Sequence, residues 1–315
     1  MNRIGRGETM SRRLRGVLLG WVVMLLVGCG RVSAPARPPA GTGLRTLAAE
    51  AFLADIAQNV AGSRIVVAAL MPSGVDPHAY EPTPGDLARV ADSDVLIVNG
   101  AGLEGFLAEM LRNAGGQRLV IEASAGLTTR EVPGTDEHHE GDPHFWLDPN
   151  KVIRYVENIR AGLSQADPGG ATAYAANAQE YVARLQELDQ WISAEVAAIP
   201  QERRLLVTNH ESFGYFADRY GFRIVGSIIP SVSTGASPSA RQLAELVDAV
   251  RAAGVPAVFL ETGSNPQLAQ QLAREAGIRV VTQLYTHSPG ATDGSAVGYI
   301  GMMEYNTRAI VDALR

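Results

Sequence analysis

The sequence predicts an α/β protein of two lobes, each a parallel-type sheet flanked by helices, joined by one long rigid helix. A chain of 315 residues is long enough for two domains of ordinary size. Nearly unbroken apolar runs alternate with helical segments, which is typical of a parallel sheet covered on both faces. Residues 171–199 contain no internal Gly or Pro and separate two such regions, so we expect one helix there.

The N-terminal lobe is expected at residues 44–170. Its predicted strands lie at 45–50, 64–70, 94–100 and 118–124, with helices over 51–62, from Thr83 and from near Leu103. Thr83 is a credible N-cap, because Pro84 takes the first helical position and Asp86 falls in the first turn. The alternation of strand and helix therefore continues through the first half of the chain.

The joining helix is preceded by another helical segment. This segment opens at Asp148, an N-cap followed by Pro149, and is broken by "DPGG" at 167–170. The helix over 171–199 carries a partial apolar stripe, formed by Tyr174, Tyr181, Leu185, Leu188, Ile192 and Val196. Because a helix is stiffer than a Gly/Ser linker, we expect only a small hinge closure between the lobes.

The C-terminal lobe is expected at residues 200–315 and repeats the alternation of the first half. Its predicted strands lie at 204–209, 222–228, 256–261 and 278–284, with helices between them, one opening at Ser237-Pro238, and a last helix over 298–314. We therefore expect a second parallel-type sheet flanked by helices.

Composition and charge limit the classes of partner. With 46% hydrophobic and 19% charged residues, the chain is globular and not disordered. Its net charge is −6; without residues 1–28, which hold five arginines and one glutamate, 22 basic and 32 acidic residues remain, a net charge of −10. This balance argues against nucleic acid as a partner and suits a cation or simple solubility. We expect a monomer.

The N-terminus predicts export. Basic residues from Arg12 to Arg15 precede the apolar run "GVLLGWVVMLLVG", which is followed by Cys29, the only cysteine. This pattern indicates a signal peptide over 1–28, starting at Met1 or Met10. "LVGC" is similar to a bacterial lipobox, so we expect Cys29 to be lipidated and 29–43 to be a flexible tether. The alternative is a plain signal peptide or anchor with an incidental cysteine. Either way, the protein is expected outside the cytoplasm.

Four of the six histidines lie past the carboxyl ends of predicted strands, namely His78, His144 (in the long loop after 118–124), His210 and His287. That edge of a parallel sheet is where ligands bind, and each lobe supplies two of the four. We therefore expect the four imidazoles to meet in one cleft. Neutral imidazole is a good ligand for Zn²⁺, and four of them make a closed tetrahedral site. For any single histidine, a surface or hydrogen-bonded role is the competing interpretation.

Two of these histidines follow Asp-Pro pairs, in "DPHAY" and "DPHFW". Pro77 and Pro143 fix the backbone before each imidazole, which lowers the entropy lost in positioning it. Asp76 and Asp142 are candidate acceptors for the imidazole N–H, with simple turn chemistry as the alternative. His138 and His139, in "DEHHEGD", could collect metal weakly or form a solvated loop, and we leave them outside the primary site.

The segments "GVDPHAYEPTPGDLARVADSDVLIVNGAGLE", "DPHFWLDP" and "TNHESFGYFADRYGF", with residues 239–277 and 284–306, resemble metal-receptor lipoproteins of bacterial zinc/manganese ABC transporters. The resemblance implies two α/β lobes bridged by one rigid helix, with one divalent metal between them for delivery to a membrane permease. It implies His78, His144 and His210 as ligands, with a fourth on the loop after "LYT". Many relatives carry aspartate there, whereas this chain carries His287.

The metal and the fourth ligand stay open at this point. Four neutral imidazoles favour Zn²⁺ over Mn²⁺, which prefers harder oxygen ligands, so zinc is expected and manganese is the alternative. Asp293 or Glu261 are alternatives to His287 as the fourth ligand. A receptor that is not an enzyme is expected. The competing functions are an extracytoplasmic zinc hydrolase with an open three-histidine site, for which Glu211 is the candidate base, and a receptor for a chelated metal.

Overall fold

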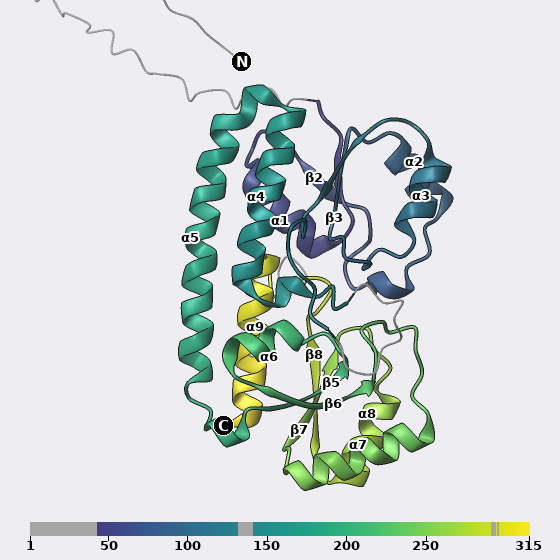
Figure 1. Cartoon of the computed structure of the whole chain (residues 1–315), viewed down its shortest axis with the longest axis vertical. Coiled ribbons are helices and arrows are strands. Elements are labelled where there is room, and N and C mark those ends of the chain that lie inside the picture. Colours follow the sequence, from purple (N-terminus) through teal and green to yellow (C-terminus); the bar gives the residue numbers. More distant parts are fainter. Residues whose placement is uncertain (1–42, 132–140, 291–293, 295) are drawn as a thin grey trace, which may run out of the picture. The chain divides into compact units, whose positions relative to one another are not determined.

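The computed structural model of the chain describes residues 43–131, 141–290, 294 and 296–315 (Figure 1). The predicted signal peptide, Cys29, His138, His139 and Asp293 lie outside the described residues. All described residues belong to one compact unit, residues 39–315. Within the described part of the chain, we find no helix that is long and apolar enough to span a membrane.

The N-terminal lobe is built on a parallel sheet of four strands in the order β2-β1-β3-β4. The strands are β1 (Thr46–Ala48), β2 (Val67–Ala69), β3 (Val95–Val98) and β4 (Leu119–Glu122). Helices α1 (Ala51–Ala61), α2 (Pro84–Ala91) and α3 (Leu107–Ala114) follow β1, β2 and β3 along the chain. The predicted parallel sheet is confirmed. Its strands are shorter than the apolar runs that predicted them.

Capping hydrogen bonds or backbone dihedral angles decide where three helices begin. Thr83 caps α2 as predicted, because its Oγ1 accepts from Asp86 N at 3.3 Å while the Asp86 carboxylate accepts from Thr83 N at 2.9 Å. The helix expected near Leu103 begins only at Leu107. Residues 100, 101 and 102 all have positive φ, and this backbone cannot continue into a right-handed helix.

The third helix, α7 (Ala240–Ala253), corrects a prediction. The helix was expected to open at Ser237-Pro238, but Ser239 is the N-cap. Ser239 Oγ accepts from Gln242 N at 3.2 Å, and Gln242 Oε1 accepts from Ser239 N at 2.8 Å. This reciprocal pair satisfies two backbone donors, and Ser237 forms no such pair.

The C-terminal lobe contains two parallel strand pairs. They are β5 (Leu205–His210) with β6 (Arg223–Ile229), and β7 (Ala257–Glu261) with β8 (Arg279–Leu284). Strands β5 and β7 pack beside each other, so both pairs end at the same edge. Helices α6 (Gly214–Tyr220), α7 and α8 (Pro266–Ala276) flank them. This places His210, the last residue of β5, next to Glu261, the last residue of β7.

The two lobes are joined by helices that run side by side in Figure 1. Helix α4 (Pro149–Ala166) leads through a 3-10 turn into α5 (Ala171–Val196), which is 26 residues or about 39 Å long. The six residues of the predicted apolar stripe are all buried. The last helix, α9 (Gly298–Leu314), packs against both α1 and α5. The long helix of the predicted fold is confirmed.

The largest hydrophobic cluster draws side chains from both lobes and from the joining helices. At its centre, Phe52 of α1 stacks on Trp146 with ring centroids 4.4 Å apart. Tyr299 of α9 is fully buried and donates from its hydroxyl to the backbone oxygen of Trp146 at 2.6 Å. Because Trp146 follows His144 by two residues, this shared core holds the His144 turn in place.

Candidate metal centre

Four histidines from four separate segments meet at the edge where the strands end. His78 lies in a 3-10 turn (Pro77–Ala79) after β2, and His144 precedes a second such turn that leads into α4. His210 ends β5, and His287 follows β8. The structure brings one nitrogen of each imidazole within 4.8 Å of the other three. The expected convergence of two histidines from each lobe is therefore present.

The spacing of the nitrogens suits a single transition-metal ion. His144 Nε2 lies 3.2 Å from His78 Nε2 and 3.1 Å from His210 Nε2. Four nitrogens set tetrahedrally at a zinc–nitrogen distance of about 2.0–2.1 Å would be about 3.3 Å apart. His144 and His210 are fully buried, and the His287 side chain is 9% exposed. The centre is therefore shielded from bulk water on most sides.

Two carboxylates set the tautomers of the buried imidazoles. Asp142 Oδ1 accepts from His144 Nδ1 at 2.8 Å, and Glu261 Oε1 accepts from His210 Nδ1 at 2.5 Å. With the proton held on Nδ1, each neutral ring directs its Nε2 lone pair toward the other histidines. Glu261, considered from the sequence as a direct ligand, thus backs His210 in this structure. Its second oxygen accepts from Thr286 Oγ1 at 2.6 Å.

The other two histidines are held differently. Asp76 Oδ1 accepts from the backbone N of His78 at 3.0 Å, and Asp76 Oδ2 accepts from Thr234 Oγ1 at 2.5 Å. Asp76 therefore shapes the turn and does not orient the imidazole ring. His287 Nδ1 lies 3.2 Å from Thr286 Oγ1, while its Nε2 is buried without a hydrogen-bond partner among the described residues. A buried nitrogen with a free lone pair is a natural metal ligand.

Electrostatics keep most of the imidazoles neutral. Burial lowers the pKa of His144 and of His287 well below the usual value, and neighbouring histidines lower it further. Burial, together with the nearby charge of His210, lowers the pKa of His78 to about 4. For His210, burial acts to lower the pKa, but the charge and hydrogen bond of Glu261 outweigh it and raise the pKa. Neutral imidazole is the form that binds metal.

The turn around His144 is tied to the rest of the centre by contacts that are remote in sequence. Trp146 Nε1 donates to Thr286 O at 2.6 Å, which links the His144 turn to the residue before His287. Asn99, which follows β3, donates from its amide to Pro143 O at 3.2 Å. Burial raises the pKa of Asp142 to about 7, and its Oδ1 accepts from the backbone N of His144 at 2.9 Å. The polar residue Asn99 at a strand end was the only sequence signal for this support.

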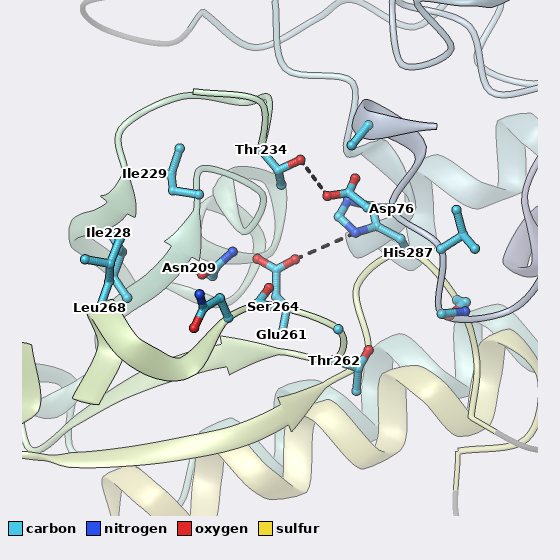
Figure 2. Close-up of a pocket in the computed structure, with 16 residues that line it drawn as sticks. Asp76, Asn209, Ile228, Ile229, Thr234, Glu261, Thr262, Ser264, Leu268 and His287 are labelled. Atoms are coloured by element: carbon cyan, nitrogen blue, oxygen red, sulfur yellow. Dashed lines mark hydrogen bonds and ion pairs between the residues drawn. The ribbon is translucent and has the colours of Figure 1, made fainter. Parts of the chain in front are cut away.

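Two cavities lie near the centre, and different residues line them. The first has a volume of about 300 Å³ and is lined by His287 and Glu261 among others (Figure 2). The second has a volume of about 280 Å³ and is lined by Glu211, Arg130 and Gly214, among others. Glu211, the candidate base of the hydrolase alternative, therefore lines a cavity without any of the four histidines.

Comparisons with known proteins identify relatives over nearly the whole chain. The family model described as ZnuA, zinc-uptake complex component A, periplasmic, matches residues 47–313. The manganese-binding lipoprotein MntA of Halalkalibacterium halodurans is 35% identical over 305 residues, covering 96% of this chain and 99% of the relative. MntA of Bacillus subtilis is 33% identical over 295 residues, covering 92% and 95%.

Solved structures show the same fold. The periplasmic zinc-binding protein TroA from Treponema pallidum is similar with a TM-score of 0.78 and 29% identity, covering 85% of this chain and 98% of that one. A manganese-bound periplasmic metal-binding protein from Candidatus Liberibacter asiaticus is similar with a TM-score of 0.77 and 26% identity, covering 86% and 99%. These matches confirm the resemblance inferred from the sequence, and the chain belongs to the family of zinc-uptake complex component A proteins.

Proposed function

We propose that the chain is the extracytoplasmic receptor of an ABC transporter: it captures one divalent transition-metal ion between its lobes and delivers it to the permease. The observation that carries this proposal is the convergence of four imidazoles from four segments, with nitrogens within 4.8 Å of one another. Lone pairs that face each other in a buried space repel, and a metal cation converts this repulsion into bonding. Relatives that are named as metal-binding lipoproteins support the same function.

Zinc is the metal that we propose as cargo. The four converging donors are nitrogens, and nitrogen donors suit Zn²⁺, whereas Mn²⁺ prefers oxygen. Asp142 and Glu261 lie directly behind two of the imidazoles, so their charge offsets that of the ion without replacing a nitrogen donor. Manganese is the alternative, because the MntA relatives are named for it.

Position 287 offers a direct test of this metal choice. We expect His287→Asp to lower the ratio of zinc affinity to manganese affinity by about tenfold, because a hard oxygen replaces a nitrogen donor. Calorimetric titration of the purified receptor with each metal measures this ratio. His287→Asn is the matched control, since asparagine has the size of aspartate without its charge. An unchanged ratio in His287→Asp would remove this position from the ligand set.

Acidification is expected to release the metal. The raised pKa of His210 makes it the first of the four histidines to take up a proton, and zinc must displace that proton. His78, with a pKa lowered to about 4, stays neutral over the same interval. We therefore expect zinc affinity to fall as the pH is lowered through the pKa of His210, by up to about tenfold per pH unit for one displaced proton. Competition titrations between about pH 5 and 7.5 measure this slope, and a flat profile would contradict it.

We further propose that the receptor acts as a monomer anchored to the outer face of the cell membrane through Cys29. The lipobox-like "LVGC" and the lipoprotein relatives support this anchor. Cys29→Ser is expected to abolish incorporation of an alkyne-labelled fatty acid and to move the protein out of the membrane fraction. Ser33→Ala, in the predicted tether, is the control. Continued labelling of Cys29→Ser would show that the anchor lies elsewhere.

We also propose that the chain is not an enzyme. A zinc hydrolase needs a general base near the metal-bound water. Glu211 lines the second cavity together with Arg130, and the cavity that reaches His287 is lined by other residues. Four histidine donors would also close the coordination sphere that an open catalytic site keeps free.

A further inference from the structure

The 300 Å³ cavity beside the metal centre has walls from both lobes (Figure 2). One wall is formed by residues of the segment from Gly74 to Ala79, which contains His78. The other wall comes from the strand ends of the C-terminal lobe. Asp76 and Thr234 join the two walls by a hydrogen bond of 2.5 Å. Glu261 is buried at the inner end, whereas Gly263 and Asn265 at the rim are exposed. The cavity therefore runs from solvent to the metal centre.

Of the four histidines, His287 alone lines this cavity in the described part of the chain. His144 and His210 are fully buried behind it. His287 thus belongs both to the cavity and to the group of converging imidazoles. An ion that moves through the cavity would meet His287 before the buried pair.

The cavity lining is suited to cations. Its charged residues, Asp76 and Glu261, are both acidic, and no Lys or Arg is among its lining residues in the described chain. Further oxygens come from Thr262, Ser264 and Asn209. A cavity lined by one sign of charge concentrates counter-ions and speeds their arrival. The same charge disfavours anionic chelates of a metal.

Asn209 is the most informative of these residues. Side chains alternate along a strand, so Asn209 points to the opposite side of β5 from His210. It is 6% exposed and lines the cavity, where its amide faces open space and has no hydrogen bond to another described residue. Water or a ligand that enters the cavity can therefore satisfy this amide. Its carbonyl oxygen can ligate a hard cation directly or accept a hydrogen bond from a water bound to the cation.

The volume of the cavity decides the form in which an ion fits. Six waters occupy about 180 Å³ at roughly 30 Å³ each. The cavity of about 300 Å³ therefore has room for a divalent ion with its water shell. The space between the four imidazole nitrogens, which lie within 4.8 Å of one another, does not.

We propose that this cavity is an outer cation subsite, in which a hydrated divalent metal ion is held by Asn209 and the surrounding oxygens. There the ion exchanges waters for protein oxygens before it passes Glu261 to reach His287 and the other imidazoles. The proposal rests on the receptor function, and it adds a second, oxygen-lined site on the path to the nitrogen-lined one. Asn209 is a positioning residue for the entering ion.

The test is the rate at which zinc binds to the purified receptor. Trp146 lies 5.1 Å from the His144 ring and 6.1 Å from the His287 ring, so stopped-flow tryptophan fluorescence follows arrival at the centre. Asn209→Leu keeps the approximate shape of the side chain and removes the carbonyl oxygen and the NH2 group of its amide. We expect it to slow zinc association by about tenfold or more. The equilibrium affinity should change by less, because the four imidazoles are retained.

Two further variants make the result decisive. Ser264→Leu, at a partly exposed loop position, should slow association in the same way and carries the test if Asn209→Leu does not fold. Ser193→Leu, at an exposed position of α5, is the control and should leave the rate unchanged. Association rates within twofold of the unmutated protein in the cavity variants would overturn the subsite and leave the receptor function intact. Absence of zinc binding by the unmutated protein would overturn both.

Discussion

His144→Ala is expected to lower the zinc affinity of the receptor by more than about 100-fold. Its Nε2 lies within 3.2 Å of the Nε2 atoms of His78 and His210, so we expect its loss to remove one of the four proposed donors and to open the centre to water. The variant also leaves Asp142 buried without its imidazole partner. Loss of a residue behind a ligand typically costs 10–100-fold in metal affinity, and loss of the ligand itself should exceed that range.

Competition with a chromophoric chelator measures this affinity. His139→Ala is the matched control, because it removes a histidine that we left outside the primary site, and it should change zinc affinity by less than about threefold. If the zinc affinity of His144→Ala stayed within tenfold of that of the unmutated protein, the four imidazoles would not act as one ligand set.

Zinc is expected to stabilise the folded receptor by about 4 kcal/mol when its free concentration is about 1,000 times the dissociation constant. The four histidines lie between residues 78 and 287, so the unfolded chain does not hold them together. For a domain of this size, that free energy corresponds to a rise in Tm of about 10 °C.

Thermal unfolding with zinc and with a chelator measures this rise. Mg²⁺ at the same concentration is the control, because it prefers oxygen ligands and keeps its waters, so it should leave the Tm nearly unchanged. His144→Ala should lose most of the rise produced by zinc. A zinc-induced rise that survives in this variant would place the stabilising ion away from the four histidines.

Features determined by neighbouring residues were predictable from the sequence. Thr83 carries its own cap signal in Pro84 and Asp86, and the apolar stripe of α5 follows from helical spacing. The four histidines were recognisable because ligands bind at the carboxyl ends of parallel strands, and each lobe supplies two histidines that follow such strands. The error at Ser237 has a local cause: Pro238 imitates a first helical position, while the capping pair of Ser239 decides the start.

Contacts between distant segments were not predictable. Glu261 backs His210 because β7 packs beside β5, although 51 residues separate the pair. Trp146 reaches Thr286 across 140 residues. Sequence spacing carries no information about such partners, since they depend on how the strands of the C-terminal lobe are arranged. The core shared by the lobes likewise depends on the docking of α9 against α1 and α5.

The most direct test of the four-histidine centre is X-ray absorption at the zinc edge of the receptor loaded with one equivalent of zinc. The structure predicts four nitrogen neighbours at about 2.0–2.1 Å, with outer-shell scattering from four imidazole rings. A first shell with carboxylate oxygen and three or fewer imidazoles would contradict the account, because His287 or another histidine would then lie outside the ligand set.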